Sequence, residues 1–271
     1  MIIHTRNKQL ELGKKTVIMG ILNVTTDSFS DGGDYTDVEQ AFLHAKQMVD
    51  EGADIIDVGG MSTRPGHEEI SIELEIQRVV PIIKKIANEL DTIISIDTYR
   101  WEVAKEALKA GAHIINDIWG LQKDNGEMAK LAFKYDVCVI AMHNQNGTEY
   151  KKDIMETEKD FFKKTFEIAK ENHIDKNKII IDPGIGFGKT AEQNLEVLKR
   201  MDELKGIAPI LLGTSRKGFL GKILNKKIPK ERVIGTVATT VLGIQKGIDI
   251  VRVHDVKENF EAILVTDSIL R

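Results

Sequence analysis

Residues 51–60 read Glu-Gly-Ala-Asp-Ile-Ile-Asp-Val-Gly-Gly, and this stretch contains the unit from which the chain is built. Glycine at position 52 is typical of a helix end. The run Asp54–Val58 predicts a short strand buried on both faces, as in a parallel sheet. A loop then opens at Gly59. The same order of glycine and strand returns after Ala110-Gly-Ala112 and after Lys246-Gly-Ile248.

Similar units fill the rest of the sequence. Segments with helical spacing, such as Val79, Ile83, Ile86 and Leu90, separate the apolar runs. The predicted strands are Thr16–Leu22, Asp54–Val58, Ile93–Asp97, His113–Ile118, Val137–Met142, Lys178–Asp182, Pro209–Gly213 and Asp249–Val253. Eight alternating units in 271 residues predict an α/β protein with a single (β/α)8 TIM-barrel domain over residues 1–271, rather than an open sheet. We expect the first dozen residues to form a short hairpin that caps the barrel bottom.

Composition narrows the class of protein. The net charge of −4 argues against a general nucleic-acid or anionic-membrane binder, which would be basic. The one cysteine, Cys138, excludes an internal disulfide framework. The sequence shows neither a signal-peptide core nor an apolar stretch long enough to cross a bilayer. We therefore expect a cytoplasmic protein, in which any anion site is formed by locally concentrated positive charge.

Polar residues follow each predicted strand. In TIM barrels the carboxyl ends of the strands carry the active site. The strand ends bring Asn23, Asp57, Asp97, Asn116, His143, Asp182, Ser215, Lys217, Arg252 and His254 toward one mouth. Asp97, Asn116 and Asp182 match a planar, donor-rich heterocycle such as an aminopyrimidinone. Arg252 and His254 alternate with valines, so both side chains point to the same side of the last strand.

The positive charge gathers after the last two strands. Lys217 follows Gly213-Thr-Ser, and loops after the seventh and eighth strands commonly hold phosphate in this fold. We interpret Asp117 and Asp255 as local structural contacts and His113 as a structural residue at the barrel bottom. The sequence indicates no protein zinc site.

Two long loops rich in Gly, Ser and Thr follow the first and second predicted strands. They cover residues 25–33 and 59–66. Phe29 is a candidate lid residue, because an apolar ring on a polar loop is more favourable when it covers a bound ligand than when it faces water. The glycines of residues 184–188 fit neither the dinucleotide nor the P-loop template, and they predict close backbone approach to a ligand instead.

These two loops carry a specific resemblance. Residues 20–33, Gly-Ile-Leu-Asn-Val-Thr-Thr-Asp-Ser-Phe-Ser-Asp-Gly-Gly, closely resemble the first signature of the dihydropteroate synthases. Residues 57–66, Asp-Val-Gly-Gly-Met-Ser-Thr-Arg-Pro-Gly, resemble the second. Shorter motifs match in order at residues 95–98, 116–118, 182–189, 215–217 and 252–255. The resemblance covers essentially the whole chain.

The resemblance implies condensation of (7,8-dihydropterin-6-yl)methyl diphosphate with 4-aminobenzoate, giving dihydropteroate and diphosphate in folate synthesis. It implies that Asp97, Asn116, Asp182 and Lys217 hold the pterin and that Arg252 stacks on the ring. Asn23, Arg252 and His254 would bind diphosphate, with Asn23 also contacting Mg²⁺. The implied aminobenzoate pocket consists of Thr63, Arg64, Pro65, Ser215, Phe29 and the backbone near Phe187. We expect Asp97, Lys217 and Arg252 to be catalytic, and the resemblance implies a homodimer and a sulfonamide target.

Three positions depart from the family pattern. Thr26 stands where the family usually has Pro, Met61 replaces a commoner Glu, and Asn144 replaces a commoner Met. None of them removes a residue assigned to the chemistry. Two alternatives remain: a methyltetrahydrofolate-dependent corrinoid methyltransferase of the same barrel family, and a non-catalytic pterin-binding module. Neither would need Thr63-Arg-Pro65 or the pair Arg252 and His254.

Overall fold

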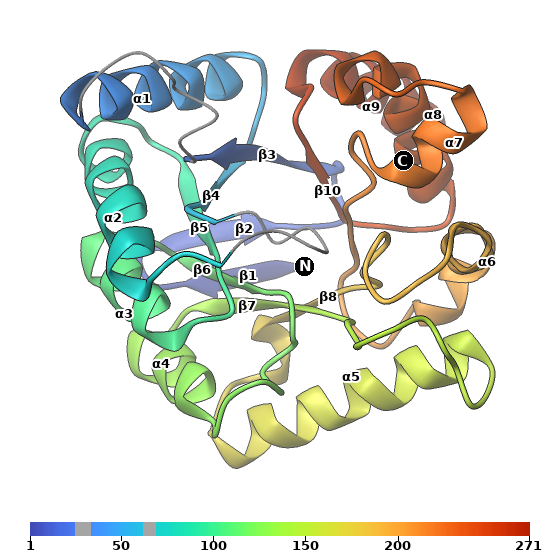
Figure 1. Ribbon diagram of the computed structural model, residues 1–271, viewed down its shortest axis with the longest axis horizontal. Coiled ribbons are helices and arrows are strands. Elements are labelled where there is room, and N and C mark those ends of the chain that lie inside the picture. The colour runs from blue at the N-terminus through green and yellow to red at the C-terminus, as the bar shows by residue number, and fades with distance from the viewer. Residues whose placement is uncertain (25–33, 62–68) are drawn as a thin grey trace.

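Eight parallel strands form a barrel at the centre of the computed structural model, which describes residues 1–24, 34–61 and 69–271 (Figure 1). The strands are hydrogen-bonded in the order β8-β7-β6-β5-β4-β3-β10-β9. The barrel closes where Ile181 bridges Ile210 in parallel and Ile181 N donates to Pro209 O at 2.9 Å. The helices form a ring around the strands (Figure 1), so the predicted TIM barrel is confirmed.

The strands lie where the apolar runs predict them. Their bounds are β3 Val17–Asn23, β4 Ile55–Gly59, β5 Ile93–Asp97, β6 Ile114–Asp117, β7 Cys138–Met142, β8 Ile179–Asp182, β9 Leu211–Leu212 and β10 Ile250–Val253. Only β9 is much shorter than expected. Pro209 has no N–H to donate, so regular pairing cannot extend through it.

The helices follow the strands in the expected alternation. They are α1 Asp34–Asp50, α2 Ile72–Glu89, α3 Trp101–Ala110, α4 Glu127–Tyr135, α5 Ile154–Glu171, α6 Ala191–Arg200, α7 Gly218–Leu224, α8 Val233–Gln245 and α9 Val256–Leu270. Short 3₁₀ turns cover Lys176–Lys178, Met201–Leu204 and Pro229–Arg232. Ser71 caps α2 by accepting a 3.1 Å hydrogen bond from Leu74 N.

Alternation along the strands divides the apolar residues into two cores. One core lies between the barrel and its helices and includes Ile56, Ile94 and Val139. The other fills the barrel interior and includes Ile55, Ile93, Ile114, Cys138, Ile140, Ile180 and Ile250. Neighbouring residues of a strand thus enter different cores.

A hairpin closes one end of the interior core. It pairs β1 (Ile2–Thr5) with β2 (Lys8–Glu11) in antiparallel register. Ile3, Leu10 and Leu12 are buried in the interior core, which confirms the predicted cap at the barrel bottom.

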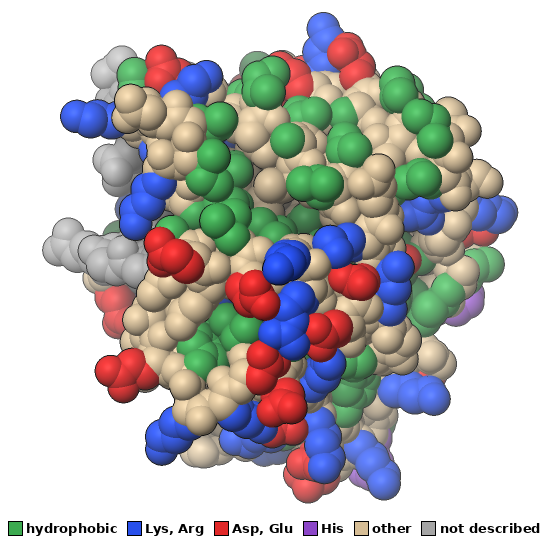
Figure 2. All heavy atoms as spheres, turned by 90° about the vertical axis from the view of Figure 1, so that its right-hand side faces the viewer, with side chains coloured by type: hydrophobic (Ala, Val, Ile, Leu, Met, Phe, Trp, Pro, Cys, Tyr) green, Lys and Arg blue, Asp and Glu red, His purple; other side chains and the backbone are tan. Residues whose placement is uncertain are grey.

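Several apolar side chains remain exposed on α7, α8, α9 and the segment after α7. Figure 2 shows hydrophobic side chains gathered over the upper part of this side of the molecule. The α7–α9 patch, as we name it, comprises Ile223, Ile228, Ile234, Leu242, Leu264, Val265 and Ile269. Across the described part of the chain, no helix has the length and apolarity needed to span a membrane.

Candidate active site

A ring of polar residues lies at the carboxyl ends of the strands, on the interior side. On β5, Ile93 belongs to the interior core, so Ser95 and Asp97 face the same side. On β10, Ile250 sets the same direction for Arg252. The same phase applies to Asn23, Asp57, Asn116 and Asp182 on their strands. The mouth of the barrel therefore brings together carboxylates, amides and the guanidinium of Arg252.

Arg252 connects three strands across this mouth. Its Nε donates to Asp57 Oδ2 at 2.6 Å, and its Nη2 donates to Asp97 Oδ2 at 2.5 Å. Asn116 Nδ2 donates to the same Asp57 oxygen at 3.1 Å. The sequence placed Asp57 at a strand end without giving it a role. Its spacing of two from Ile55 is the signal that places it inside the barrel.

Several buried oxygens of this ring have no hydrogen-bond partner among the described residues. They are Asp57 Oδ1, Asp97 Oδ1 and Ser95 Oγ. Burial raises the pKa of Asp97 to about 7, against the opposing effect of the Arg252 charge. A buried acceptor without a donor is costly. This wall therefore suits a ligand that presents several N–H donors.

The opposite wall consists of Asp182, Lys217 and Phe187. Asp182 Oδ1 accepts a hydrogen bond from Gly184 N at 2.7 Å. Lys217 Nζ donates to Ile185 O and lies 4.9 Å from the ring centroid of Phe187. Burial raises the pKa of Asp182 and lowers the pKa of Lys217 to about 8.

Gly213 lies between these groups and the Arg252 wall. A Cβ at this position would stand 3.8 Å from Asp182 Oδ2 and 3.9 Å from Lys217 Nζ. It would also stand 3.9 Å from Arg252 Cβ. Three of the residues predicted to bind the planar ring, Asp182, Lys217 and Arg252, thus approach one backbone position.

Two more residues predicted for the site, Ser215 and His254, follow β9 and β10 and lie in contact with each other. Ser215 Oγ accepts a hydrogen bond from His254 N at 3.1 Å and lies 2.9 Å from His254 Nδ1. On the other side, a Cβ built on Gly59 would lie 3.7 Å from both Asn23 Oδ1 and Asp97 Oδ2. An amide oxygen and a carboxylate oxygen, the types of atom that bind metal ions, therefore lie at the mouth next to β3.

Some predicted residues lie outside the described part of the chain. These are Phe29, Thr63, Arg64 and Pro65, together with the departure at Thr26. Of the other two departures, Met61 is buried and Asn144 is partly exposed.

The two aspartates interpreted as structural both have partners within the protein. Asp117 accepts hydrogen bonds from Trp119 N at 2.9 Å and from Leu121 N at 2.7 Å. Burial raises its pKa to about 6. Asp255 pairs with Arg216. The predicted local contact is confirmed for Asp117, whereas the partner of Asp255 lies 39 positions away in the sequence.

The prediction that His143 joins the mouth is wrong. Cys138 and Ile140 face the barrel interior, so Met142 faces inward and His143 faces outward, toward α5. Its Nδ1 lies 2.9 Å from Lys189 Nζ and 3.9 Å from Glu158 Oε1. Burial lowers the pKa of His143 to about 2, so the ring is neutral. Strand alternation, applied here as on the last strand, would have predicted this.

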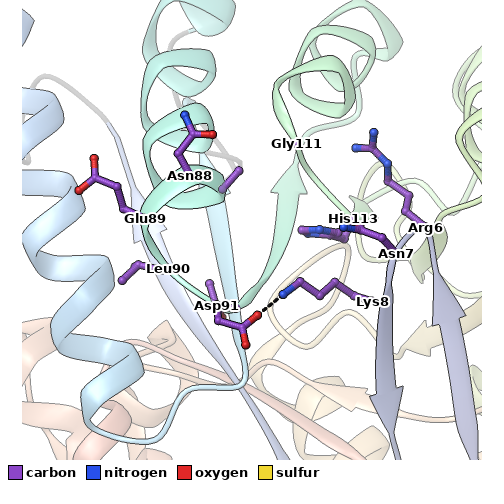
Figure 3. A pocket seen from close by; sticks show the side chains of 11 residues that line it. Arg6, Asn7, Lys8, Asn88, Glu89, Leu90, Asp91, Gly111 and His113 are labelled. Carbon is purple, nitrogen blue, oxygen red and sulfur yellow. Dashed lines mark hydrogen bonds and ion pairs between the residues drawn. The ribbon is translucent and has the colours of Figure 1, made fainter.

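A hollow of about 420 Å³ lies at the opposite end of the barrel (Figure 3). Its charged groups already have partners. Lys8 pairs with Asp91, and Arg6 Nη1 donates to Leu108 O and Ala112 O, each at 2.8 Å. His113 Nδ1 accepts a hydrogen bond from Ile94 N at 3.1 Å, which agrees with its structural interpretation. The residues at this end therefore join the hairpin to the barrel, and the candidate active site is the polar ring at the carboxyl ends of the strands.

The family model for "Pterin binding enzyme" matches residues 19–254, a range that includes nearly all of the barrel strands and the polar ring at their ends. The dihydropteroate synthase of Clostridium beijerinckii is 54% identical over 267 residues, covering 98% of both chains. The chain therefore belongs to the pterin-binding enzymes and, within them, to the dihydropteroate synthases.

Solved structures agree with this assignment. A dihydropteroate synthase from Clostridium difficile, crystallised in the presence of pteroic acid, has a TM-score of 0.94 and 59% identity. The match covers 97% of this chain and 99% of that chain. The enzyme from Xanthomonas albilineans with 4-aminobenzoic acid has a TM-score of 0.89 and 36% identity, over 94% and 93% of the two chains.

Proposed function

We propose that this protein condenses (7,8-dihydropterin-6-yl)methyl diphosphate with 4-aminobenzoate, as a transferase of folate biosynthesis. The observation that carries the proposal is the set of buried oxygens of Asp57, Asp97 and Ser95, on the interior side of β4 and β5, that have no hydrogen-bond partner among the described residues. Pterin edges carry N–H donors that would satisfy such oxygens. Asn116 adds an amide on the neighbouring strand β6, and Asp182 adds an acceptor on β8, on the opposite wall.

The reaction needs no protein nucleophile. A C–N bond forms to the aminobenzoate nitrogen as the C–O bond to diphosphate breaks, and the nitrogen releases a proton to solvent. Asp97 stabilises positive charge that develops on the pterin, while Arg252 and His254 stabilise the departing diphosphate. Because Arg252 is already fixed by two carboxylates, its orientation costs little when the substrate arrives.

The aminobenzoate is expected beside Ser215 and Phe187. Ser215 Oγ is oriented by His254, and the Phe187 ring lies next to Lys217. Thr63, Arg64, Pro65 and Phe29 are proposed to complete this pocket on the basis of the resemblance.

Magnesium fits the oxygen donors next to β3. Asn23 Oδ1 and Asp97 Oδ2 both approach the backbone of Gly59. Mg²⁺ prefers oxygen ligands and usually keeps several waters together with substrate phosphates. Asn23 is the residue proposed to contact it. The ion would neutralise charge on the leaving diphosphate.

We also propose a homodimer that forms through the α7–α9 patch. Ile234 and Ile269 are 73% and 75% exposed, so these apolar side chains lie in contact with water in the single chain. A group of exposed apolar side chains on one side of a molecule favours a protein partner, and a second copy of the chain is the partner that the family resemblance implies. We propose a cytoplasmic location, where a lone thiol such as Cys138 stays reduced.

One assay separates the candidate functions. Purified protein is incubated with the pterin diphosphate, 4-aminobenzoate and Mg²⁺, and both diphosphate and dihydropteroate are measured. We expect diphosphate release that depends on aminobenzoate. Methyl transfer from methyltetrahydrofolate to a corrinoid, or pterin binding without turnover, would replace this proposal with one of the two alternatives.

A further inference from the structure

The turn that follows β8, residues 183–188, contains three glycines and one internal backbone hydrogen bond, from Phe187 N to Gly184 O at 3.0 Å. Gly184, Gly186 and Gly188 have φ angles of +66°, +87° and +55°. A Cβ on Gly184 would lie 2.0 Å from His143 O, so no other residue fits there. Glycine has more conformational freedom than any other residue. A turn with three glycines therefore needs contacts from outside to stay fixed.

The position of this turn determines the geometry of the pterin wall. Asp182 precedes the turn and binds Gly184 N. The carbonyl of Ile185 binds Lys217 Nζ, and the Phe187 ring lies under the same ammonium. A displacement of the turn would move these groups together.

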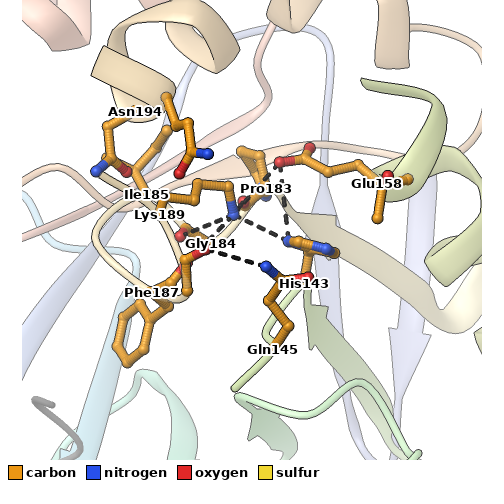
Figure 4. Close-up of polar contacts among 12 residues, drawn as sticks. His143, Gln145, Glu158, Pro183, Gly184, Ile185, Phe187, Lys189 and Asn194 are labelled. Atoms are coloured by element: carbon orange, nitrogen blue, oxygen red, sulfur yellow. Dashed lines mark hydrogen bonds and ion pairs between the residues drawn. The ribbon is translucent and has the colours of Figure 1, made fainter. Parts of the chain in front are cut away.

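Lys189 binds the turn from behind, on the side away from the barrel mouth (Figure 4). Its Nζ donates to Pro183 O at 2.8 Å, to Gly184 O at 3.3 Å and to Phe187 O at 3.4 Å. The side chain is fully buried. One ammonium thus ties together the first, second and fifth residues of the turn.

Two buried groups hold the ammonium itself. His143 Nδ1 lies 2.9 Å from Lys189 Nζ, and Glu158 Oε1 of α5 lies 3.4 Å from it. Burial raises the pKa of Glu158 to about 7 and lowers that of Lys189. Neither Glu158 oxygen makes a hydrogen bond within the described residues. Glu158 therefore balances the charge of Lys189 and makes no hydrogen bond to the turn. Lys189 binds the first, second and fifth residues of the turn, whereas Asn194 and Tyr150 bind Gly186 and Gly188.

We infer that Lys189 is a positioning residue for the pterin site: it fixes the turn 183–188 and thereby sets the places of Asp182 and Lys217. This inference rests on the proposed function for its kinetic test. It assigns a role in the reaction to a side chain that contacts no substrate. Glu158 supports it as the counter-charge.

The test separates turn contacts from charge balance. Lys189→Met alone would leave Glu158 buried without a cation, so the informative variant is Lys189→Met with Glu158→Gln. That double variant removes both charges at similar volume, a change that is often neutral for stability. Glu158→Gln alone keeps the Lys189 contacts to the turn. Lys199→Met, an exposed lysine on α6, is the matched control.

We expect the double variant to melt within a few degrees of the unaltered protein. We expect its kcat/KM for the pterin diphosphate to fall about a hundredfold, mainly through KM, since misplacement by about 1 Å costs that much. Glu158→Gln and Lys199→Met should stay within about threefold of the unaltered protein. A double variant with unaltered melting and unaltered KM would overturn the inference.

Two further measurements keep the test decisive. Lys189→Arg retains a cation beside Glu158, so it should fold even if the Met variants do not. Its planar group cannot place one nitrogen against all three carbonyls, and an unaltered KM in this variant would also overturn the inference. Pteroic acid affinity, measured by calorimetry, needs no turnover. If the unaltered protein binds pteroic acid without catalysis, the proposed function fails, while the loss of affinity in the variants still tests Lys189.

Discussion

Arg252 on β10 donates a 2.5 Å hydrogen bond from Nη2 to Oδ2 of Asp97 on β5. Two strands lie between them in the sheet, since the order runs β5-β4-β3-β10. The contact therefore crosses the barrel mouth instead of following its wall. Asp97 Oδ1, the other oxygen of this carboxylate, is buried and has no hydrogen-bond partner among the described residues.

Asp97→Asn should lower kcat/KM for the pterin diphosphate by about 10²–10³-fold, the range for losing one electrostatic contact to the transition state. The amide keeps the shape of the side chain but not its negative charge. Steady-state diphosphate release measures the effect. Asp91→Asn, at an exposed aspartate paired with Lys8 at the barrel bottom, is the control and should change nothing. Normal turnover by Asp97→Asn would remove this residue from the mechanism.

Lys217 should set the alkaline limit of activity. Its pKa is lowered to about 8 by burial, so the ammonium is lost as the pH rises through that value. We expect kcat/KM to be highest between about pH 7, above which the Asp97 carboxylate is ionised, and about pH 8, and to fall at higher pH. Lys217→Arg, with a side chain that stays charged, should move the fall to higher pH. An unmoved alkaline limb in that variant would assign the titration to another group.

Removal of Mg²⁺ with a chelator should stop diphosphate release, and added Mg²⁺ should restore it. Asn23→Ala should raise the Mg²⁺ concentration for half-maximal rate by about tenfold, because ligand-sphere changes commonly cost 10–100-fold in metal affinity. Asn7→Ala, at an exposed asparagine between β1 and β2, is the matched control. Full activity in chelator would contradict the metal proposal.

Val265→Glu should convert the proposed dimer into monomers. Val265 is 63% exposed in the α7–α9 patch, so the single chain tolerates a charge there, whereas a buried unpaired charge at an interface costs about 2–5 kcal/mol. Sedimentation velocity measures the change. Leu43→Glu alters a 56% exposed residue of α1, outside the patch, and should leave the dimer intact. A monomeric unaltered protein would end the dimer proposal.

Leu10→Ala should destabilise the protein by about 2–5 kcal/mol without changing kcat, as expected for a buried leucine. Leu10 is 3% exposed and packs in the interior core at the end remote from the site. Chemical denaturation measures the loss, and the kinetic assay at a permissive temperature measures kcat. A large drop in kcat with unchanged stability would show that the two ends of the barrel are coupled.

The barrel and most of the polar ring follow from the sequence because both depend on local periodicity. Ile250 and Arg252 are two residues apart, and Ile93 and Asp97 are four apart, so spacing alone assigns the direction of the side chains. The pairing of Asp57 with Arg252 could not be read in this way, since 195 positions separate the two residues.

The buried group of Lys189, Glu158 and His143 was missed for a related reason. It joins a turn, a helix and a strand end, and each of the three residues alone resembles an ordinary polar position. Their meeting depends on how α5 packs against the barrel, which no local pattern encodes. Phe29, Thr63, Arg64 and Pro65 stay predictions.

The hairpin of β1 and β2 lies at the end of the barrel remote from the active site, so the two ends can be changed independently. Ile3, Leu10 and Leu12 seal the barrel interior at one end, and Arg252, Asp97 and Lys217 occupy the other. The residues that stabilise the barrel interior and the residues of the proposed substrate site are therefore different residues at opposite ends of the barrel. Thermal stability could therefore be raised by substituting a few side chains at the hairpin end, without changing the residues of the active site.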